Sequence, residues 1–238
     1  MINMKNKQSI IVCFLTVING FYPLLCLISY LFGYSVYTAF SHIYSLWLAV
    51  IFLYANHFIR KSEEEQVLKF ERICAAFLPL ITAVNFTVYV FKYESLSIAL
   101  IMGVCLVFAA VIAEKILNST KAKMFSVVTS GFLCFVSIIF SLLIVFSSCF
   151  SEKTLESHIL SPNRTYYADV INVDQGALGG NTVVYVHRSR GVNLFLVSFL
   201  KNPQEIYVGE WGESETMQIE WKNENTLIID GKEYVITI

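Results

Sequence analysis

The chain has 238 residues, of which 56% are hydrophobic and only 15% charged, and its mean hydropathy is +0.61. Soluble domains carry about 25% charged residues, so this composition excludes an ordinary water-soluble globule. The net charge of -1 excludes the strongly basic surface of a nucleic-acid-binding protein, and we expect no nucleic-acid partner.

Residues 1–150 contain long apolar runs that predict a membrane α-helical bundle. A helix needs about 20 predominantly apolar residues to cross the hydrocarbon core of a bilayer. Five segments meet this requirement: Ile10–Phe32, Val36–Ile59, Ile73–Phe91, Leu96–Ala113 and Phe125–Phe150. The first is longer than the core of a signal peptide and no A-x-A-like cleavage site follows it. We therefore expect residues 1–150 to form a domain of five transmembrane helices in contact with the lipid bilayer.

The basic residues alternate between the connections of these segments. The N-terminus, the second connection and the fourth connection hold nine of them: Lys5, Lys7, Arg60, Lys61, Lys69, Arg72, Lys115, Lys121 and Lys123. The other connections hold only Lys92. Cytoplasmic loops collect Lys and Arg, so we expect a cytoplasmic N-terminus. An odd number of spans then places the C-terminal half outside the cytoplasm.

Polar residues inside the predicted spans are few. His42, His57, Asn85 and Glu114 lie within the spans or at their ends. Such residues can mark transport or proton pathways, but these four form no recognisable catalytic or ligand motif. Interfacial anchoring or hydrogen bonding between helices explains each of them.

The last 88 residues change from continuous apolar runs to alternating ones, which predicts a small all-β antiparallel domain over 162–238. Residues 215–238 read as a three-stranded meander. Asp230-Gly231 predicts a type I′ turn, which sets Leu227 opposite Tyr234. Residues 151–161 have no clear period, and we expect them to form a stalk.

Upstream of the meander we expect further strands at Tyr166–Asp174, Val183–Arg188, Val192–Leu200 and Glu205–Val208. In the first of these, Ala168 and Val170 share one face, whereas Ile171 and Val173 share the other. A change of phase of this kind predicts a bulge or a bend.

The β-domain offers no motif for catalysis. His158 and His187 are its only histidines, and neither has a recognisable partner in the sequence. Glu210, Trp211 and Glu213 form a possible partner surface, although they lack the order of a calcium loop. The glycine-rich segment 175–180 lacks the spacing of a phosphate-binding loop. We therefore expect no catalytic residue, no cofactor and no metal site.

One further motif concerns lipid attachment. The stretch Phe146-Ser147-Ser148-Cys149 is faintly similar to a lipobox, but it ends a fifth span instead of an N-terminal signal. We do not expect Cys149 to be lipidated.

Several turn and strand signatures of the C-terminal third resemble a known family. They are Ser161-Pro162-Asn163, Asp174-Gln175-Gly176-Ala177, Ile219-Glu220-Trp221 and Asn225-Thr226-Leu227-Ile228-Ile229-Asp230-Gly231. Residues Leu160–Ile238 resemble small extracytoplasmic β-domains of unknown function from low-GC Gram-positive bacteria, which are tethered by a lipid or a membrane helix. The resemblance implies a bacterial envelope location and supplies no catalytic residue.

These observations favour a non-enzymatic, multi-pass protein of the bacterial cell membrane. Its β-domain would bind an envelope protein or a cell-surface ligand outside the cytoplasm. The alternative is a small transporter or immunity-type membrane protein, in which the helices act and the β-domain is a cap.

Overall fold

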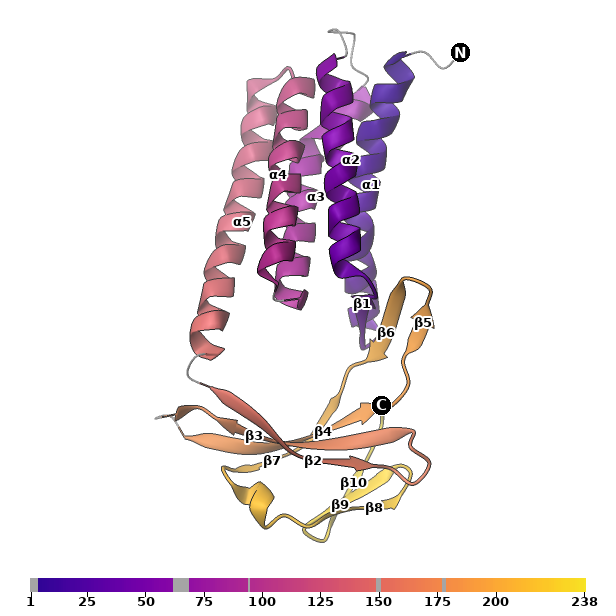
Figure 1. The fold of residues 1–238 in the computed structure, drawn as a ribbon, viewed down its shortest axis with the longest axis vertical. Coiled ribbons are helices and arrows are strands. Elements are labelled where there is room, and N and C mark those ends of the chain that lie inside the picture. Colours follow the sequence, from indigo (N-terminus) through magenta and orange to yellow (C-terminus); the bar gives the residue numbers. More distant parts are fainter. Residues whose placement is uncertain (1–3, 62–68, 94, 149–150, 177–178) are drawn as a thin grey trace. The chain divides into compact units, whose positions relative to one another are not determined.

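The computed structural model of the chain describes residues 4–61, 69–93, 95–148, 151–176 and 179–238; Cys149 lies outside them. The chain divides into two compact units (Figure 1). The first unit comprises Met1–Leu27 and Phe40–Leu142, and the second comprises Ile28–Ala39 and Leu143–Ile238. The second unit therefore includes the segment Ile28–Ala39, which runs from the last turn of the first helix to the residue before Phe40.

Five helices account for the apolar half: α1 Met4–Leu31, α2 Ser41–Lys61, α3 Lys69–Tyr93, α4 Leu96–Ile116 and α5 Thr120–Ser148. Each is long and apolar enough to cross a membrane, which confirms the prediction of five such helices. The predicted second segment began too early, at Val36. Helix α2 begins at Ser41 because the residues before it form a strand.

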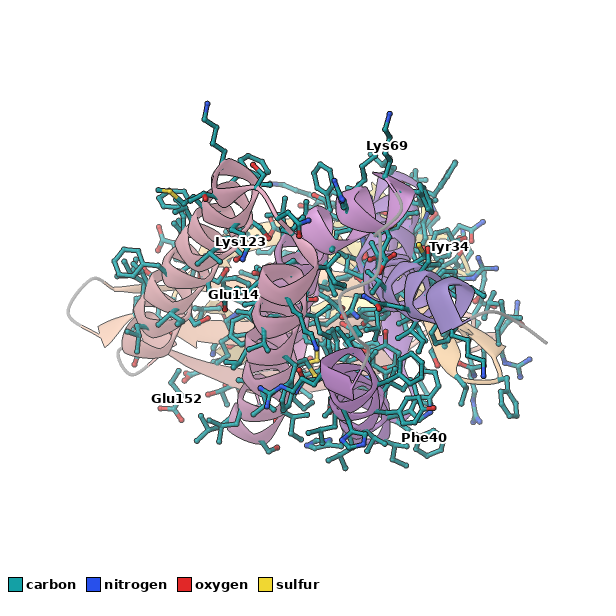
Figure 2. All side chains as sticks on the ribbon, turned by 90° about the horizontal axis from the view of Figure 1, so that it is seen from above. Tyr34, Phe40, Lys69, Glu114, Lys123 and Glu152 are labelled. Atoms are coloured by element: carbon teal, nitrogen blue, oxygen red, sulfur yellow. The ribbon has the colours of Figure 1, made fainter. Side chains whose placement is uncertain are left out.

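The surface of the helices is rich in large apolar side chains, which project outward when the molecule is viewed along the helices (Figure 2). Phe14, Phe21, Val107 and Phe132 are all at least half exposed. An apolar surface this extensive needs lipid or protein to cover it.

Basic residues collect at one end of the helical unit. Helices α2 and α4 end there, and α3 and α5 begin there (Figure 1). These ends carry Arg60, Lys69, Arg72, Lys115, Lys121 and Lys123. Lys92, in the last turn of α3, lies at the opposite end. The helices thus preserve the charge alternation seen in the sequence.

Strand β1 (Tyr34–Thr38) lies between α1 and α2 and was not predicted. It pairs with strand β6 (Val197–Lys201), which in turn pairs with β5 (Val192–Leu194). The register sets Val36 opposite Phe199. The order β1-β6-β5 therefore joins the connection between two helices to the C-terminal half of the chain.

Two further antiparallel sheets make up the rest of the second unit. The four-stranded sheet has the order β2-β3-β4-β7, with strands β2 Glu152–Leu160, β3 Tyr166–Asp174, β4 Gly180–Arg188 and β7 Gln204–Glu210. The three-stranded sheet has the order β10-β9-β8, with strands β8 Ile219–Asn223, β9 Thr226–Ile229 and β10 Lys232–Val235. The separate antiparallel β region and the three-stranded meander are thus confirmed.

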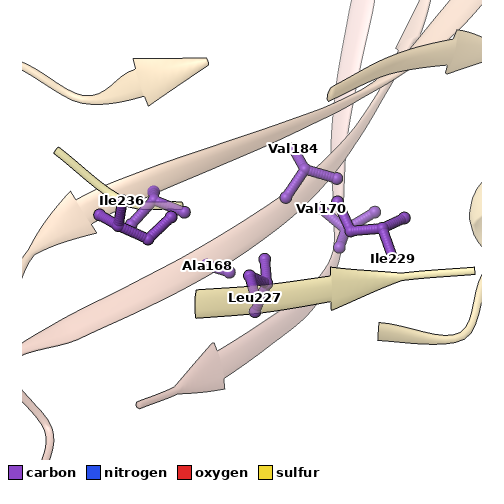
Figure 3. Packing of buried hydrophobic residues seen from close by; sticks show 7 residues of the cluster. Ala168, Val170, Val184, Leu227, Ile229 and Ile236 are labelled. Atoms are coloured by element: carbon purple, nitrogen blue, oxygen red, sulfur yellow. The ribbon is translucent and has the colours of Figure 1, made fainter. Parts of the chain in front are cut away.

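The two sheets enclose one apolar core (Figure 3). Its buried members are Ala168, Val170, Val184, Val186, Leu227, Ile229 and Ile236. Alternate residues of β3 and β4 point into it, as the period of two in a strand requires. The neighbouring residues of β3 and β4 therefore lie on the opposite face of the four-stranded sheet.

The Asp230-Gly231 turn has the predicted form. Both residues have positive φ, 47° at Asp230 and 77° at Gly231, as a type I′ turn requires. Leu227 pairs with Tyr234 across the hairpin.

Two predictions about strands are wrong. Residues 151–161, expected to be a stalk, form β2, an edge strand whose side chains are mostly exposed and therefore show no alternation. Val192–Leu200, expected to be one strand, is the β5–β6 hairpin, which turns at Phe195 and Leu196.

The bulge expected in β3 lies in its partner strand. The register of β2 against β3 shifts between Leu155 and Ser157, opposite Ile171 and Val170, whereas the pairing of β3 with β4 is regular. The phase change in the sequence therefore marked the right position but the wrong strand.

Candidate functional site

A polar and aromatic cluster occupies the sheet face opposite the core. Three adjacent strands supply it: β2 supplies His158, β3 supplies Tyr167 and Asp169, and β4 supplies His187. The register explains the grouping, because His158 pairs with Asp169 and Tyr167 pairs with His187. We call these four residues the histidine face.

Asp169 lies between the two histidines. His158 Nδ1 is 2.7 Å from Asp169 Oδ1, and His187 Nε2 is 3.4 Å from Asp169 Oδ2. The exposed fraction of the side chain is 47% for His158, 27% for His187 and 16% for Asp169. One carboxylate therefore contacts two imidazole rings, through Nδ1 of His158 and Nε2 of His187.

The ring of Tyr167 packs between the two imidazoles. Its centroid is 4.7 Å from that of His187, with the planes 4° apart, and 4.7 Å from that of His158. Tyr185 extends the row, because its ring lies 6.5 Å from His187 and its hydroxyl donates to Glu205. The face is thus a row of aromatic rings with polar atoms at its edges.

Burial changes the pKa of two members of the cluster, His187 and Tyr167. It lowers the pKa of His187 below 6.5, against the attraction of Asp169 and together with repulsion from His158. Burial and the charge of Asp169 raise the pKa of Tyr167. At neutral pH His187 is therefore uncharged, and its ring can donate through one nitrogen and accept through the other.

Asp169 lies within ion-pair distance of both imidazoles. Within the described ranges, no group of three His, Cys, Asp or Glu side chains is placed to hold a metal ion. In the same part of the chain, neither imidazole is hydrogen-bonded to a hydroxyl or a thiol. The side chains of the histidine face interact through hydrogen bonding and ring stacking.

The predicted partner surface, Glu210, Trp211 and Glu213, lies at and just beyond the end of β7. Trp211 is 60% exposed, yet its ring covers the backbone of Gly180, where an added Cβ would lie 2.5 Å from Trp211 Cδ1. Glu210 is exposed. This surface shares no residue with the histidine face.

Both carboxylate oxygens of Glu213 accept hydrogen bonds from the protein. Oε1 accepts from the Tyr207 hydroxyl at 2.7 Å, and Oε2 accepts from the Glu210 N–H at 2.9 Å. The first of these hydrogen bonds raises the pKa of Tyr207 to about 12. Glu213 therefore fastens the turn after β7 to the strand itself.

Sequence reasoning missed the partner of both histidines. The turn at Ser161-Pro162-Asn163 was the available signal, because a turn at this point implies a strand before it that pairs with Tyr166–Asp174. In that pairing His158 lies opposite Asp169. Residues 151–161 lack alternation, so this strand was not expected and the pair was not found.

A second polar cluster is buried in the helical unit. Asn85 and Asn19 are fully buried, and Asn85 Nδ2 lies 3.4 Å from Asn19 Oδ1. Asn85 Oδ1 is buried and has no hydrogen-bond partner among the described residues. Tyr89 is also buried and stacks on Tyr44, with ring centroids 5.5 Å apart.

Comparisons with known proteins identify no relative. No protein-family model, no curated protein and no solved structure matches this chain.

Proposed function

We propose that the chain is a multi-pass protein of the bacterial cell membrane whose β-domain is a non-catalytic binding module outside the cytoplasm. The histidine face is the proposed binding surface, and its ligand is an envelope protein or another cell-surface molecule. The observation that carries the proposal is the collection of His158, Tyr167, Asp169 and His187 on a face that the core does not use.

The pairing of β1 with β6 supports the proposed topology. Hydrogen-bonded strands must lie in one compartment, so the connection between α1 and α2 shares a compartment with the C-terminal domain. Five spans produce this result, since the first connection and the chain after the fifth span lie on the same side. The basic ends of the helices then favour the opposite side as the cytoplasmic one.

The composition of the histidine face supports binding. Asp169 and His187 are partly withdrawn from water, which costs them solvation, yet neither sheet needs these groups for its apolar core. Tyrosine is enriched at protein interfaces because its ring is apolar and its hydroxyl is polar. A ligand with a flat face and hydrogen-bonding groups fits this row of rings.

The buried cluster of Asn19, Asn85 and Tyr89 favours the alternative function. Polar groups inside membrane spans commonly mark substrate or ion pathways, and Asn85 Oδ1 is buried without a hydrogen-bond partner among the described residues. In that case the helices transport a small polar solute or ion, and the β-domain is a cap.

Complementation of a deletion strain separates the two functions. The full chain is expressed with His158→Ala and His187→Ala together, with Asn85→Leu, or with Lys222→Ala as a control. Lys222 forms an exposed ion pair with Glu233 away from the histidine face, so its loss should change little. Membrane levels of each variant are matched by immunoblot.

We expect the double histidine variant to lose complementation and the Asn85 and Lys222 variants to keep it. Loss with Asn85→Leu and full activity of the histidine variant would instead establish the helices as the active part. A histidine variant as active as the control would overturn the proposed binding surface.

A further inference from the structure

We propose that the tip of the β5–β6 hairpin, Leu194-Phe195-Leu196, inserts into the lipid headgroup region of the bilayer. The occupant of this apolar tip is the bilayer into which the helices themselves insert. The inference rests on the proposed membrane topology and goes beyond it, because it assigns a lipid contact to the β-domain.

The tip is apolar where a hairpin is normally polar. Phe195 is 95% exposed, Leu194 60% and Leu196 51%. Turns between strands in water favour Gly, Asn, Asp and Ser. Nothing in the described residues covers Phe195, and its exposure to water would oppose folding.

Phe195 also has an unfavourable backbone conformation. Its φ is 45°, and it occupies the first position of a two-residue turn between Leu194 and Val197. In a hairpin of this form, glycine normally takes that position. A bulky residue in the left-handed region is an outlier that calls for an explanation. Burial of the ring in an apolar environment offsets this cost.

The tip is held next to the start of a predicted span. The Ala39 N–H donates to the carbonyl of Leu196 at 2.9 Å, and α2 begins two residues later at Ser41. At the other end of β6, the Asn202 N–H donates to the carbonyl of Gly33, just after α1. Strand β6 is therefore fastened at both ends to the short connection between two spans.

The charges around the hairpin fit a membrane surface. Residues 191–200 contain no charged side chain, and Arg188, Arg190 and Lys201 flank them. The C-terminal half as a whole is acidic, so this basic flank is a local exception. Anionic headgroups attract basic residues beside an inserted apolar segment.

Interfacial side chains on β1 extend the same surface. Lys201 Nζ lies 4.7 Å from the ring centroid of Tyr34, and Lys201 Nζ is 3.4 Å from the carbonyl oxygen of Phe32. Tyrosine and lysine are typical of the boundary between hydrocarbon and water. A lipid contact at the tip is thus continuous with the point where α1 leaves the bilayer.

Depth-dependent quenching tests the inference on the full chain. The native cysteines are replaced by alanine, and single cysteines are introduced as Phe195→Cys, Leu196→Cys, Val107→Cys or Lys232→Cys. Each variant carries an environment-sensitive fluorophore and is reconstituted, one copy per nanodisc, in phosphatidylcholine and phosphatidylglycerol. Half of the samples include lipid with a nitroxide on the acyl chain, with the nitroxide near the headgroup in one set and near the end of the chain in another.

We expect nitroxide lipid to quench the fluorophore at positions 195 and 196. The label at Val107, in the middle of α4, should be quenched by the nitroxide near the end of the acyl chain, and the label at Lys232 in the three-stranded sheet should be quenched by neither nitroxide. Quenching at 107 with none at 195 and 196 would overturn the lipid contact alone. Absence of quenching at 107 would sink the membrane proposal itself.

A second copy of the chain could also cover the tip. In that case the labels at 195 and 196 would shift to the blue only in proteoliposomes with many copies, and nitroxide lipid would not quench them. That result would overturn insertion into lipid, and it is distinct from the result expected in single-copy nanodiscs.

Discussion

The hydroxyl of Ser161 donates a hydrogen bond of 2.6 Å to Glu224 Oε1, across 63 residues of sequence. The same carboxylate accepts from the backbone N–H groups of Asn163 and Thr165. Glu224, in the turn between β8 and β9, therefore closes the turn between β2 and β3. The sequence signature at Ser161-Pro162-Asn163 thus has a structural role that joins the two sheets.

The Glu224 contact predicts a stability that depends on pH. Burial would raise the pKa of Glu224, but hydrogen bonds from Ser161, Asn163 and Thr165 lower it below its ordinary value of 4.5. A lowered pKa in the folded state stabilises the protein above pH 4.5, and the stabilisation disappears as the pH falls through the folded-state pKa. Glu224→Gln should therefore lower the melting temperature at pH 7, and the difference from wild type should shrink below pH 4.5.

Glu233→Gln is the matched control for this experiment. Glu233 forms an exposed ion pair with Lys222, and pairs of this kind contribute little to stability. Its melting temperature should stay near that of wild type throughout. If the melting difference of Glu224→Gln were the same at pH 4 and at pH 7, the ionised carboxylate would not be the stabilising group.

Gly231→Ala should destabilise the β10–β9 hairpin through the backbone alone. An added Cβ meets no atom within 4 Å, but the φ of 77° is unfavourable for alanine. The cost is about 1–2 kcal/mol, and each kcal/mol lowers the melting temperature of a small domain by about 4–8 °C. Calorimetry of the full chain in detergent measures the shift. Gly231→Asn should lower the melting temperature less than Gly231→Ala does, because asparagine tolerates positive φ. Equal decreases for the two variants would contradict the conformational argument.

Alanine substitutions at Glu213 and Glu210 should affect thermal melting differently, although only two residues separate these positions. Glu213→Ala removes the acceptor of the Tyr207 hydroxyl and the Glu210 N–H, which costs about 1 kcal/mol per hydrogen bond. Glu210→Ala removes an exposed carboxylate and should leave thermal melting unchanged. Indistinguishable melting curves for the two variants would show that Glu213 does not hold the turn.

Cysteine cross-linking can test the pairing of β1 with β6. Tyr37 pairs directly with Ser198, and directly opposite residues have Cβ atoms about 4.5–5.5 Å apart, close enough for a disulfide after small adjustment. In a chain without its native cysteines, Tyr37→Cys with Ser198→Cys should form a disulfide under mild oxidation. The offset pair Tyr37→Cys with Leu200→Cys should react poorly. A faster reaction of the offset pair would mean that the register is wrong.

The proposed membrane topology predicts the activity of fused reporters. A reporter that is active only in the cytoplasm should be active when fused after Lys121 and silent when fused at Ile238. A reporter that is active only outside the cytoplasm should give the reverse pattern. Cytoplasmic activity at Ile238 would require an even number of spans and would discard the extracytoplasmic domain.

Features encoded by neighbouring residues could be predicted from the sequence. Asp230-Gly231 fixes its turn through the φ angles of two adjacent residues, and the pairing of Leu227 with Tyr234 then follows by counting. Five long apolar runs likewise predict five helices without knowledge of their packing. In both cases the physical cause lies within one short segment.

Features that depend on distant pairing could not be predicted in this way. Residues around Val36 continue an apolar run, and only the presence of β6 makes them a strand. The edge position of β2 exposes both of its faces, which removes the alternation that marks a strand. The histidine face depends on the register of β2, so it was lost together with that strand.

The place of β1 in the chain has a consequence for biosynthesis. The hydroxyl of Ser35 is bonded to Asn202, 167 residues further along the chain. During translation, β1 therefore emerges before its partner strand β6, and its edge stays unpaired while α2, α3, α4 and α5 are synthesised. Unpaired strand edges invite aggregation and recognition by quality-control factors. Formation of the β1–β6 pair is consequently a late event that requires synthesis of the chain through Lys201, and a product truncated before β6 retains the exposed edge of β1.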